Sequence, residues 1–137
     1  MRYHGLVGMA APQIGINLRM FVTEVRKTRT RDPRQADHVR VFINPRIARF
    51  SKQKAFGYEG CGSVVGGGLF GEVKRSSQVS VIAYSLKGER FALEASDLLA
   101  RIIQHETDHL DGRVFLDRMP NPKSFMSRGE YLSRKAK

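Results

Sequence analysis

The residues of this sequence best suited to chemistry are His105 and His109, which stand four positions apart with Glu106 directly after the first. Residues at this spacing lie one above the other on the same face of a helix, so both imidazoles can bind one metal ion. A carboxylate beside such an ion can carry protons to and from a water molecule. The alternative is an ordinary amphipathic helix whose histidines happen to face inward. Two imidazoles buried next to a carboxylate are costly without a ligand, which favours the metal site.

A helix that could hold these residues is predicted over residues 95–112. A serine and an aspartate can cap its start, a glycine can end it, and apolar residues recur three and four positions apart. One stripe of this helix carries Leu98 and Ile102 in line with the two histidines. The opposite, polar side is predicted to hold Gln104, Thr107 and Asp111.

A catalytic metal site usually has three protein ligands and one position left for water, so a third ligand is needed. The candidates are Cys61, His4, His38 and the carboxylates. Thiolate is a strong ligand, and Cys61 stands between two glycines at the end of a predicted strand, from where its sulfur can reach a helix packed on the sheet. His38 lies in a charged segment and is expected to be exposed. Cys61, His105 and His109 are therefore the preferred ligand set.

Length and composition indicate one soluble domain. A chain of 137 residues can bury about two-thirds of its unfolded surface. The single cysteine excludes an internal disulfide and suits a reducing compartment. No apolar run approaches the length of a membrane span, and the first residues lead into no signal-peptide core. We therefore expect an intracellular protein in which residues 1–137 form one catalytic domain.

The charge of the chain is strongly basic, with a net charge of +11 from 24 basic and 13 acidic side chains. Such a surface would attract a polyanion such as RNA, although a solvated basic surface without a partner explains the charge equally well. Basic residues gather in residues 26–40, predicted to be an exposed loop, and in the C-terminal residues 124–137. We expect neither DNA nor a membrane as a partner.

Alternating and β-branched residues predict short antiparallel strands ahead of the helix, at residues 18–25, 39–43, 47–50, 54–58, 79–84 and 90–93. The pair Asn44-Pro45 is predicted to end the second strand, and the glycine-rich stretch from Gly66 to Gly71 is predicted to be a flexible turn rather than a phosphate-binding loop. A terminal helix is expected from about Ser124. The prediction is an α+β fold in which antiparallel strands pack around a central metal-binding helix, with a C-terminal helix.

Three segments of the sequence match the motifs of one enzyme family. Residues 6–13 (LVGMAAPQ), 59–63 (EGCGS) and 104–109 (QHETDH) correspond, in the right order, to the patterns G-φ-G-φ-A-A-x-Q, E-G-C-φ-S and Q-H-E-x-D-H, where φ is apolar. With these motifs the chain resembles the peptide deformylases, enzymes that remove the formyl group from the N-terminal methionine of nascent chains. The resemblance covers nearly the whole chain and is greatest to the bacterial and organellar iron enzymes.

The resemblance implies a metal centre with assigned roles. Cys61, His105 and His109 would hold the metal, typically Fe(II) in this family, with zinc, nickel or cobalt as substitutes. Such an ion makes water acidic enough to supply a nucleophile near neutral pH. Glu106 would accept the proton of that water and deliver it to the departing amine.

The resemblance also implies how the substrate is held. Gln13 and the backbone N–H of Gly62 would donate hydrogen bonds to the oxygen of the tetrahedral intermediate. Glu59 would support the metal ligands from outside. The Gly8 backbone would pair with the formyl-methionyl peptide as an added strand. The methionine pocket would be lined by Val7, Leu98 and Ile102.

The sequence departs from the family pattern in three places. Leu6 stands where the family usually has glycine, and Gly62 stands where it usually has an apolar or larger residue. Family members carry about a helix and a strand ahead of the first motif, whereas this chain starts four residues before Gly5. We expect either a shortened form or a natural start further upstream. None of these departures removes a metal ligand.

Two alternatives to a deformylase remain open. One is a hydrolase with the same metal ligands but another substrate, such as a different N-acyl amidase or a metallopeptidase. The other is an inactive relative that binds the ribosome or RNA through its basic surface, against which the complete set of metal ligands argues. A deformylase would act in the cytoplasm, or in an organellar matrix if an N-terminal segment precedes this sequence, and ribosome contact through the basic surface is a further hypothesis.

Overall fold

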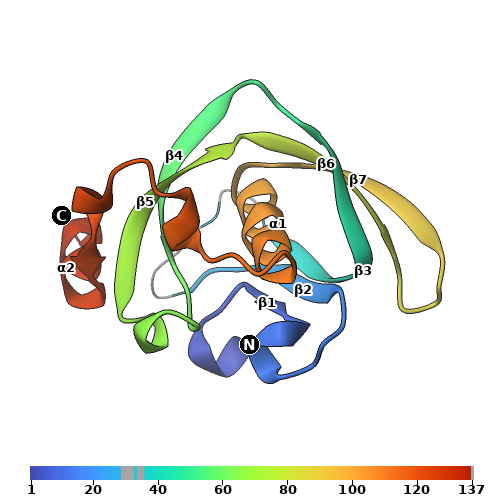
Figure 1. Cartoon of the computed structure of the whole chain (residues 1–137), viewed down its shortest axis with the longest axis horizontal. Coiled ribbons are helices and arrows are strands. Elements are labelled where there is room, and N and C mark those ends of the chain that lie inside the picture. The colour runs from blue at the N-terminus through green and yellow to red at the C-terminus, as the bar shows by residue number, and fades with distance from the viewer. Residues whose placement is uncertain (29–32, 34–35, 137) are drawn as a thin grey trace.

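The computed structural model describes residues 1–28, 33 and 36–136. A single long helix, α1 (Asp97–Leu110), lies at the centre and is surrounded by two antiparallel sheets (Figure 1). The predicted α+β class, with antiparallel strands around a central helix, is therefore confirmed. Among the described helices, none is long and apolar enough to cross a membrane.

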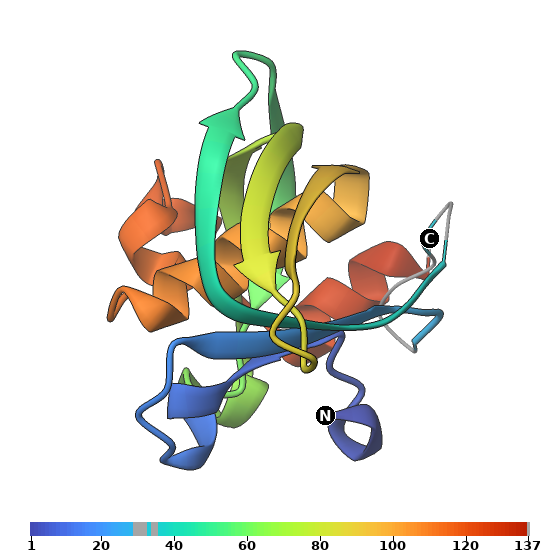
Figure 2. The same ribbon diagram turned by 90° about the vertical axis from the view of Figure 1, so that its right-hand side faces the viewer.

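The larger sheet has five strands in the described part of the chain. In spatial order the strands are β1 (Gly8–Ala10), β2 (Met20–Val25), β3 (Asp37–Phe50), β6 (Gln78–Tyr84) and β7 (Arg90–Ser96). The side view shows β3, β6 and β7 side by side in front of α1, with β1 and β2 below the helix (Figure 2). Each neighbouring pair is antiparallel. The sheet therefore ends at β1 on one side, which leaves that edge open.

The smaller sheet carries the segment that brings the cysteine to the helix. Its strands are, in spatial order, β4 (Lys54–Gly60), β5 (Leu69–Ser76) and β8 (Met126–Ser127). The C-terminal helix α2 (Arg128–Lys135) follows β8 directly. Short 3-10 turns occupy Arg2–His4, Ala11–Ile14, Val65–Gly67, Phe115–Arg118 and Pro122–Ser124.

The main core lies between α1 and the five-stranded sheet. Ala100 and Ile103 of the helix are fully buried against Phe21 and Phe42, whose rings stack with their centroids 4.7 Å apart. Burying one side chain of this size stabilises a fold by about 1.5–3 kcal/mol. This packing fixes the face that α1 turns toward the smaller sheet, which is the face with the histidines.

The predicted end of a strand at Asn44-Pro45 is wrong, because β3 continues through this pair to Phe50. Asn44 adopts a positive φ of 49°, and the pairing of β3 with β6 shifts register between Ile43 and Arg46. A bulge of this kind places the proline, which has no N–H to donate, at an irregular point of the ladder. The first half of β3 pairs with β2 and the second half with β6.

The glycine-rich stretch is a turn only in its first part. Gly66 and Gly67 have positive φ values of 58° and 77°, which favour glycine, but β5 begins at Leu69. Gly71 lies inside this strand, where a Cβ atom would approach the Met119 Sδ to 2.5 Å. Glycine is needed at position 71 for close packing. The sequence pattern alone does not distinguish a glycine needed for packing from a glycine in a flexible turn.

The two basic segments also differ from their predicted structure. Part of the segment predicted as a loop, Asp37 to Arg40, belongs to β3, and residues 29–32 and 34–35 lie outside the described residues. The terminal helix begins at Arg128 rather than near Ser124, because the Ser127 hydroxyl caps it by accepting the Glu130 N–H at 3.1 Å.

Candidate metal centre and substrate pocket

Cys61, His105 and His109 come together in the structure although the cysteine is far from the histidines in sequence. One ligand atom from each of the three lies within 4.8 Å of the others. The Cys61 Sγ is 3.2 Å from the His109 Nε2. Cys61 directly follows β4, and the two histidines are one turn apart on α1. The end of a strand in one sheet and a face of the central helix thus meet at one point.

Both imidazoles are held by their Nδ1 atoms. The His105 Nδ1 lies 2.9 Å from the Glu59 Oε2, and the His109 Nδ1 lies 3.1 Å from the Arg113 carbonyl oxygen. Contacts of this kind fix the orientation of a histidine ring and leave its Nε2 for a metal ion. The geometry therefore suits the coordination of one ion by two Nε2 atoms and a sulfur.

Glu59 is itself held by two arginines. The Arg75 guanidinium donates to both Glu59 carboxylate oxygens at 3.0 and 2.9 Å, and Arg101 donates at 2.7 Å. Burial of Glu59 would raise its pKa, but the bonds from His105 and Arg75 hold that pKa well below its usual range. Glu59 therefore stays ionised beside His105.

The same arginine connects the support of His105 to Asp108, which lies one turn further along α1. Arg75 donates to the Asp108 carboxylate at 2.5 Å, and Arg118 donates to the same carboxylate at 2.6 Å. Both Arg75 and Asp108 are buried, each 5% exposed. β4, β5, α1 and the 3-10 turn after α1 are thereby joined in one network of charges.

The electrostatics of the three ligands favour a bound cation. Burial would raise the pKa of the Cys61 thiol, but the adjacent imidazoles of His105 and His109 lower it to about 5. Burial would lower the pKa of His105, but its contacts with Cys61 and Glu59 raise it. Binding of a metal ion would displace protons from such ligands, because a metal needs a thiolate and unprotonated ring nitrogens.

Glu106 lies beside these three residues, and one of its carboxyl oxygens is left unpaired in the described part of the chain. It is 4% exposed, and among the described residues its Oε2 atom has no hydrogen-bond partner. Burial raises its pKa to about 7. A carboxyl group with a pKa near neutrality can both take and give a proton at cellular pH. The thiol, two imidazoles and this unpaired carboxyl together fit a catalytic metal centre.

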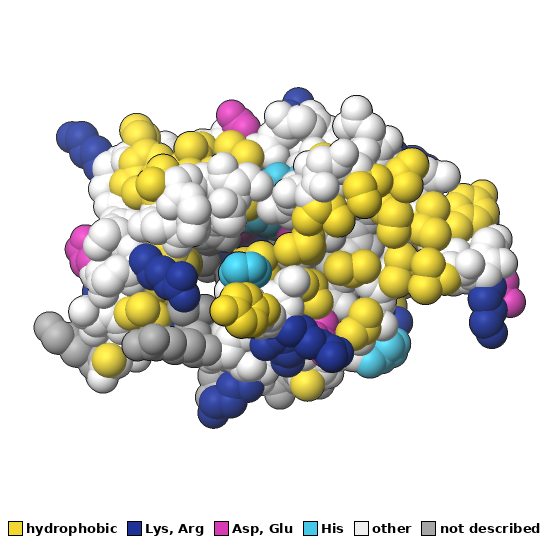
Figure 3. Space-filling view, turned by 90° about the horizontal axis from the view of Figure 1, so that it is seen from below, with side chains coloured by type: hydrophobic (Ala, Val, Ile, Leu, Met, Phe, Trp, Pro, Cys, Tyr) yellow, Lys and Arg dark blue, Asp and Glu magenta, His cyan; other side chains and the backbone are white. Residues whose placement is uncertain are grey.

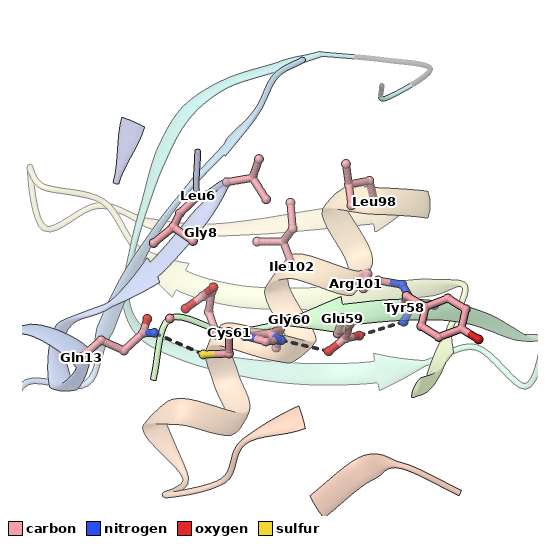
Figure 4. Close-up of a pocket in the computed structure, with 14 residues that line it drawn as sticks. Leu6, Gly8, Gln13, Tyr58, Glu59, Gly60, Cys61, Leu98, Arg101 and Ile102 are labelled. Atoms are coloured by element: carbon pink, nitrogen blue, oxygen red, sulfur yellow. Dashed lines mark hydrogen bonds and ion pairs between the residues drawn. The ribbon is translucent and has the colours of Figure 1, made fainter. Parts of the chain in front are cut away.

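Gln13 reaches the cysteine from the 3-10 turn after β1. Its Oε1 accepts the Ala10 N–H at 2.9 Å, and its Nε2 donates to the Ser63 Oγ at 3.1 Å and to the Cys61 Sγ at 3.6 Å. Figure 4 shows the Gln13 side chain directed at Cys61 across the pocket. The bond to Ala10 fixes the amide so that its N–H side faces the metal ligands.

The predicted substrate-binding residues line one cavity with the metal ligands. Its lining includes Val7, Gly8, Gly62, Leu98 and Ile102. Figure 4 shows Gly8 on β1, and Leu98 and Ile102 on α1, around this space. The cavity also reaches Gln13, Cys61, His105 and Glu106. All the predicted site residues except His109 therefore border one space.

Other residues of the site were not predicted from the sequence as site residues. Tyr58 and Arg101 line the cavity, and Arg75 holds Glu59 from behind. The sequence could have indicated Arg101 as a site residue, because it lies four positions before His105 on the same helical face. Nothing in the sequence indicates Arg75, since its position in a strand does not reveal that its partners come from β4 and α1.

The prediction that Gln104 lies on an exposed polar side of α1 is wrong, because Gln104 is only 6% exposed. Its Oε1 accepts the Ser76 N–H at 3.1 Å, and its Nε2 donates to the Ser76 carbonyl at 2.9 Å. The amide therefore takes the place of a neighbouring strand where the chain passes from β5 to β6. An amide that satisfies both backbone groups can be buried at low cost.

The fold and this site place the protein in the H-E-x-x-H class, with Cys61 close enough to the two histidines to serve as a third ligand for a metal ion. Comparison with known proteins gives the family. The family model described as "Polypeptide deformylase" matches residues 1–125. The chain belongs to the polypeptide deformylase family.

Curated relatives from bacteria agree with this assignment. The peptide deformylase of Treponema pallidum (strain Nichols) is 44% identical over 119 residues, which are 87% of this chain and 66% of that protein. Peptide deformylase 2 of Gloeobacter violaceus is 44% identical over 116 residues, 84% of this chain and 58% of that protein. The chain therefore spans less than two thirds of the length of these relatives.

Solved structures of the family have the same fold. The class I type b peptide deformylase from Acinetobacter baumannii with Met-Ala-Ser bound has a TM-score of 0.79 and 36% identity, covering 87% of this chain and 74% of that one. A peptide deformylase from Synechococcus elongatus in complex with actinonin has a TM-score of 0.76 and 34% identity, covering 97% of this chain and 65% of that one.

Proposed function

We propose that this protein is a metal-dependent hydrolase that removes the N-formyl group from the formyl-methionine of nascent polypeptides. The observation that carries the proposal is the buried, unpaired carboxyl group of Glu106 beside the convergent ligand atoms of Cys61, His105 and His109. A metal-dependent amide hydrolase uses this combination, because water must lose a proton and the departing amine must gain one.

The ligand set of one sulfur and two nitrogens suits Fe(II), our first choice, and also zinc, nickel or cobalt. Such an ion supplies Lewis-acid chemistry that polarises a carbonyl and makes water more acidic. Glu106 would take the proton of the attacking water and return it to the amine nitrogen. Its pKa near 7 suits both steps.

The proposed reaction also needs hydrogen-bond donors for the oxygen that becomes negative when water adds to the formyl carbon. The Gln13 Nε2 points toward Cys61, and Gly62 follows Cys61 at the rim of the same cavity. Donors that are already oriented before the reaction stabilise developing charge at little cost of reorganisation. We assign this role to the Gln13 amide and the Gly62 N–H.

The open edge of β1 is suited to pair with a peptide. The Val7 carbonyl accepts the Glu24 N–H of β2 at 2.8 Å. Since antiparallel residues alternate between pairing with the neighbour and facing away, both backbone groups of Gly8 face the open edge. The next outward group, the Ala10 N–H, is taken by Gln13. A formyl-methionyl peptide paired with Gly8 would put its side chain against Val7, Leu98 and Ile102.

Turnover of formyl-Met-Ala-Ser by protein loaded with Fe(II) or nickel without oxygen tests the proposal. We expect formate release that a chelator stops and fresh metal restores. Glu106→Gln should lower kcat by about 100-fold or more, because the general base is lost. Glu89→Gln, in the exposed β6–β7 turn, is the matched control and should behave like the unchanged protein.

Two results would contradict the proposal. Hydrolysis of the acetylated peptide at a higher rate than the formylated one would favour another N-acyl amidase with the same ligands. Folded, metal-loaded protein that cleaves neither peptide would favour a relative that binds without turnover.

A second prediction concerns the contact between β1 and Glu106. A Cβ atom on Gly8 would collide with the Glu106 Oε1 and lie 2.7 Å from the Ile102 Cγ2. Gly8→Ala should therefore displace the carboxyl group and lower kcat/KM by about 100-fold, the cost of a misplacement of roughly 1 Å. Gly129→Ala is the control, because its Cβ atom would meet only the Ser127 Oγ at 3.8 Å. Wild-type kcat/KM in folded Gly8→Ala would refute the placement of Glu106 against β1.

We also propose that the basic surface brings the protein to the ribosome, where its substrate emerges, in the cytoplasm or in an organellar matrix. The exposed end of α2 carries Arg134 and Lys135, and the net charge of the chain is +11. Co-sedimentation with ribosomes should decrease when residues 128–137 are removed, and should decrease with added salt. Co-sedimentation that is unchanged by the deletion would refute this partner.

A further inference from the structure

A second cavity opens directly beside the pocket that contains the metal ligands. The two cavities share Leu6, Gln13, Gly60, Cys61 and Gly62. The lining of the second cavity also includes His4, Gly5, Met9 and Arg128. The face onto which they open is hollowed near its centre (Figure 3).

The path from the first cavity to the second follows the open edge of β1. Leu6 and Met9 flank the part of the chain whose outward backbone groups belong to Gly8, and both residues line the second cavity. A peptide that pairs with Gly8 and runs antiparallel to β1, away from the metal ligands, would continue along Leu6 and Gly5 toward His4. A third hollow beside α2 touches neither Gln13 nor the metal ligands.

Gly62 leaves the boundary between the two cavities open. A Cβ atom at this position would meet no other atom within 4 Å, and the residue does not adopt a positive φ. Neither packing nor backbone conformation therefore requires glycine here. Because residue 62 is a glycine, no side chain stands at the boundary between the two cavities. The residues that follow the formyl-methionine of a substrate can therefore pass over it.

The second cavity is basic in the described structure. His4 and Arg128 are its ionisable side chains apart from Cys61, and no carboxylate lines it. The arginines of the neighbouring network, Arg75 and Arg101, are paired with Glu59. The exposed Arg128 side chain, in contrast, has no hydrogen bond or ion pair with any residue that the structure describes.

Arg128 stands on a fixed part of the backbone. Its N–H donates to the Gly68 carbonyl at 2.9 Å, and the preceding Ser127 pairs with Leu69 of β5. Ser127 also caps α2 by accepting the Glu130 N–H. The guanidinium group thus projects from a strand-to-helix junction whose backbone is held on both sides. Only the side chain of Arg128, and not its backbone, can move to meet a ligand in the cavity.

From the shared boundary, the open rim and the unpaired guanidinium, we propose that the second cavity binds the residues that follow the formyl-methionine and that Arg128 selects an acidic side chain there. This inference rests on the proposed deformylase function. It makes Arg128 a specificity-determining residue for peptides whose third or fourth residue is Asp or Glu. A charge pair at such an exposed site changes affinity by about two- to fivefold.

The test compares formyl-Met-Ala-Glu-amide with formyl-Met-Ala-Gln-amide, and the same pair with the variable residue one position later. The amide end removes the C-terminal carboxylate, which would otherwise supply a second anion. At low salt the glutamate peptide should have a kcat/KM about two- to fivefold higher, through a lower KM, and added salt should remove the difference. Arg128→Gln should bring the ratio to about one. Arg134→Gln, which removes the same charge from another turn of α2, should keep the wild-type ratio.

Binding gives a readout without catalysis. Fluorescently labelled Met-Ala-Glu-amide and Met-Ala-Gln-amide, which lack the formyl group, should show the same preference by anisotropy, and Arg128→Gln should remove it. Equal kcat/KM for both formyl peptides in the wild-type protein, at both positions, would overturn this inference while leaving the proposed function intact. Loss of the preference in Arg134→Gln as well would also overturn it. No turnover of any formyl peptide would overturn the proposed function, and the inference with it.

Discussion

The site depends on the buried ion pair between Glu59 and Arg75. Glu59 holds the ring of His105, and Arg75 holds both Glu59 and Asp108, so one guanidinium joins β4, β5 and α1. Removing one partner of such a buried pair costs roughly 3–5 kcal/mol, because the other charge remains unpaired in a medium of low polarity. The pair therefore favours the single arrangement in which the end of β4 lies against the histidine face of α1.

The arrangement of Cys61 against α1 follows from this constraint. The five-stranded sheet fixes α1 through Ile103 and Ala100, and the charge network fixes the smaller sheet against the opposite side of the helix. Cys61 leaves β4 where the two meet, so its sulfur faces ligands that come from a different layer of the fold. The same packing buries Glu106 and raises its pKa. The packing of two sheets against one helix thus accounts both for the convergence of the metal ligands and for the raised pKa of Glu106.

Much of this could be predicted from the sequence where local spacing carries the information. The histidine pair, the hairpin of β6 and β7 and the α+β class follow from periodicity. The chemistry of thiolate favoured Cys61 as the third ligand, and the family resemblance supplied the role of Gln13. Three features could not be predicted, because distant contacts decide them. Gln104 is buried because the backbone of Ser76 needs a hydrogen-bond partner. Gly71 lies in a strand because Met119 packs directly against it. Strand β3 continues through Asn44-Pro45 because its two halves pair with different strands. Arg75 escaped prediction for the same reason.

The most direct test of the central role of this network is the zinc affinity of Glu59→Gln, measured by competition with a chromogenic chelator. The substitution keeps the size of the side chain but removes the charge that orients His105, so the affinity should fall by roughly 10- to 100-fold. Glu94→Gln removes an equal charge from an exposed pair with Arg49 on the larger sheet and should leave the affinity unchanged. Wild-type zinc affinity in folded Glu59→Gln would contradict the account, because the ligands would then be positioned without the buried pair.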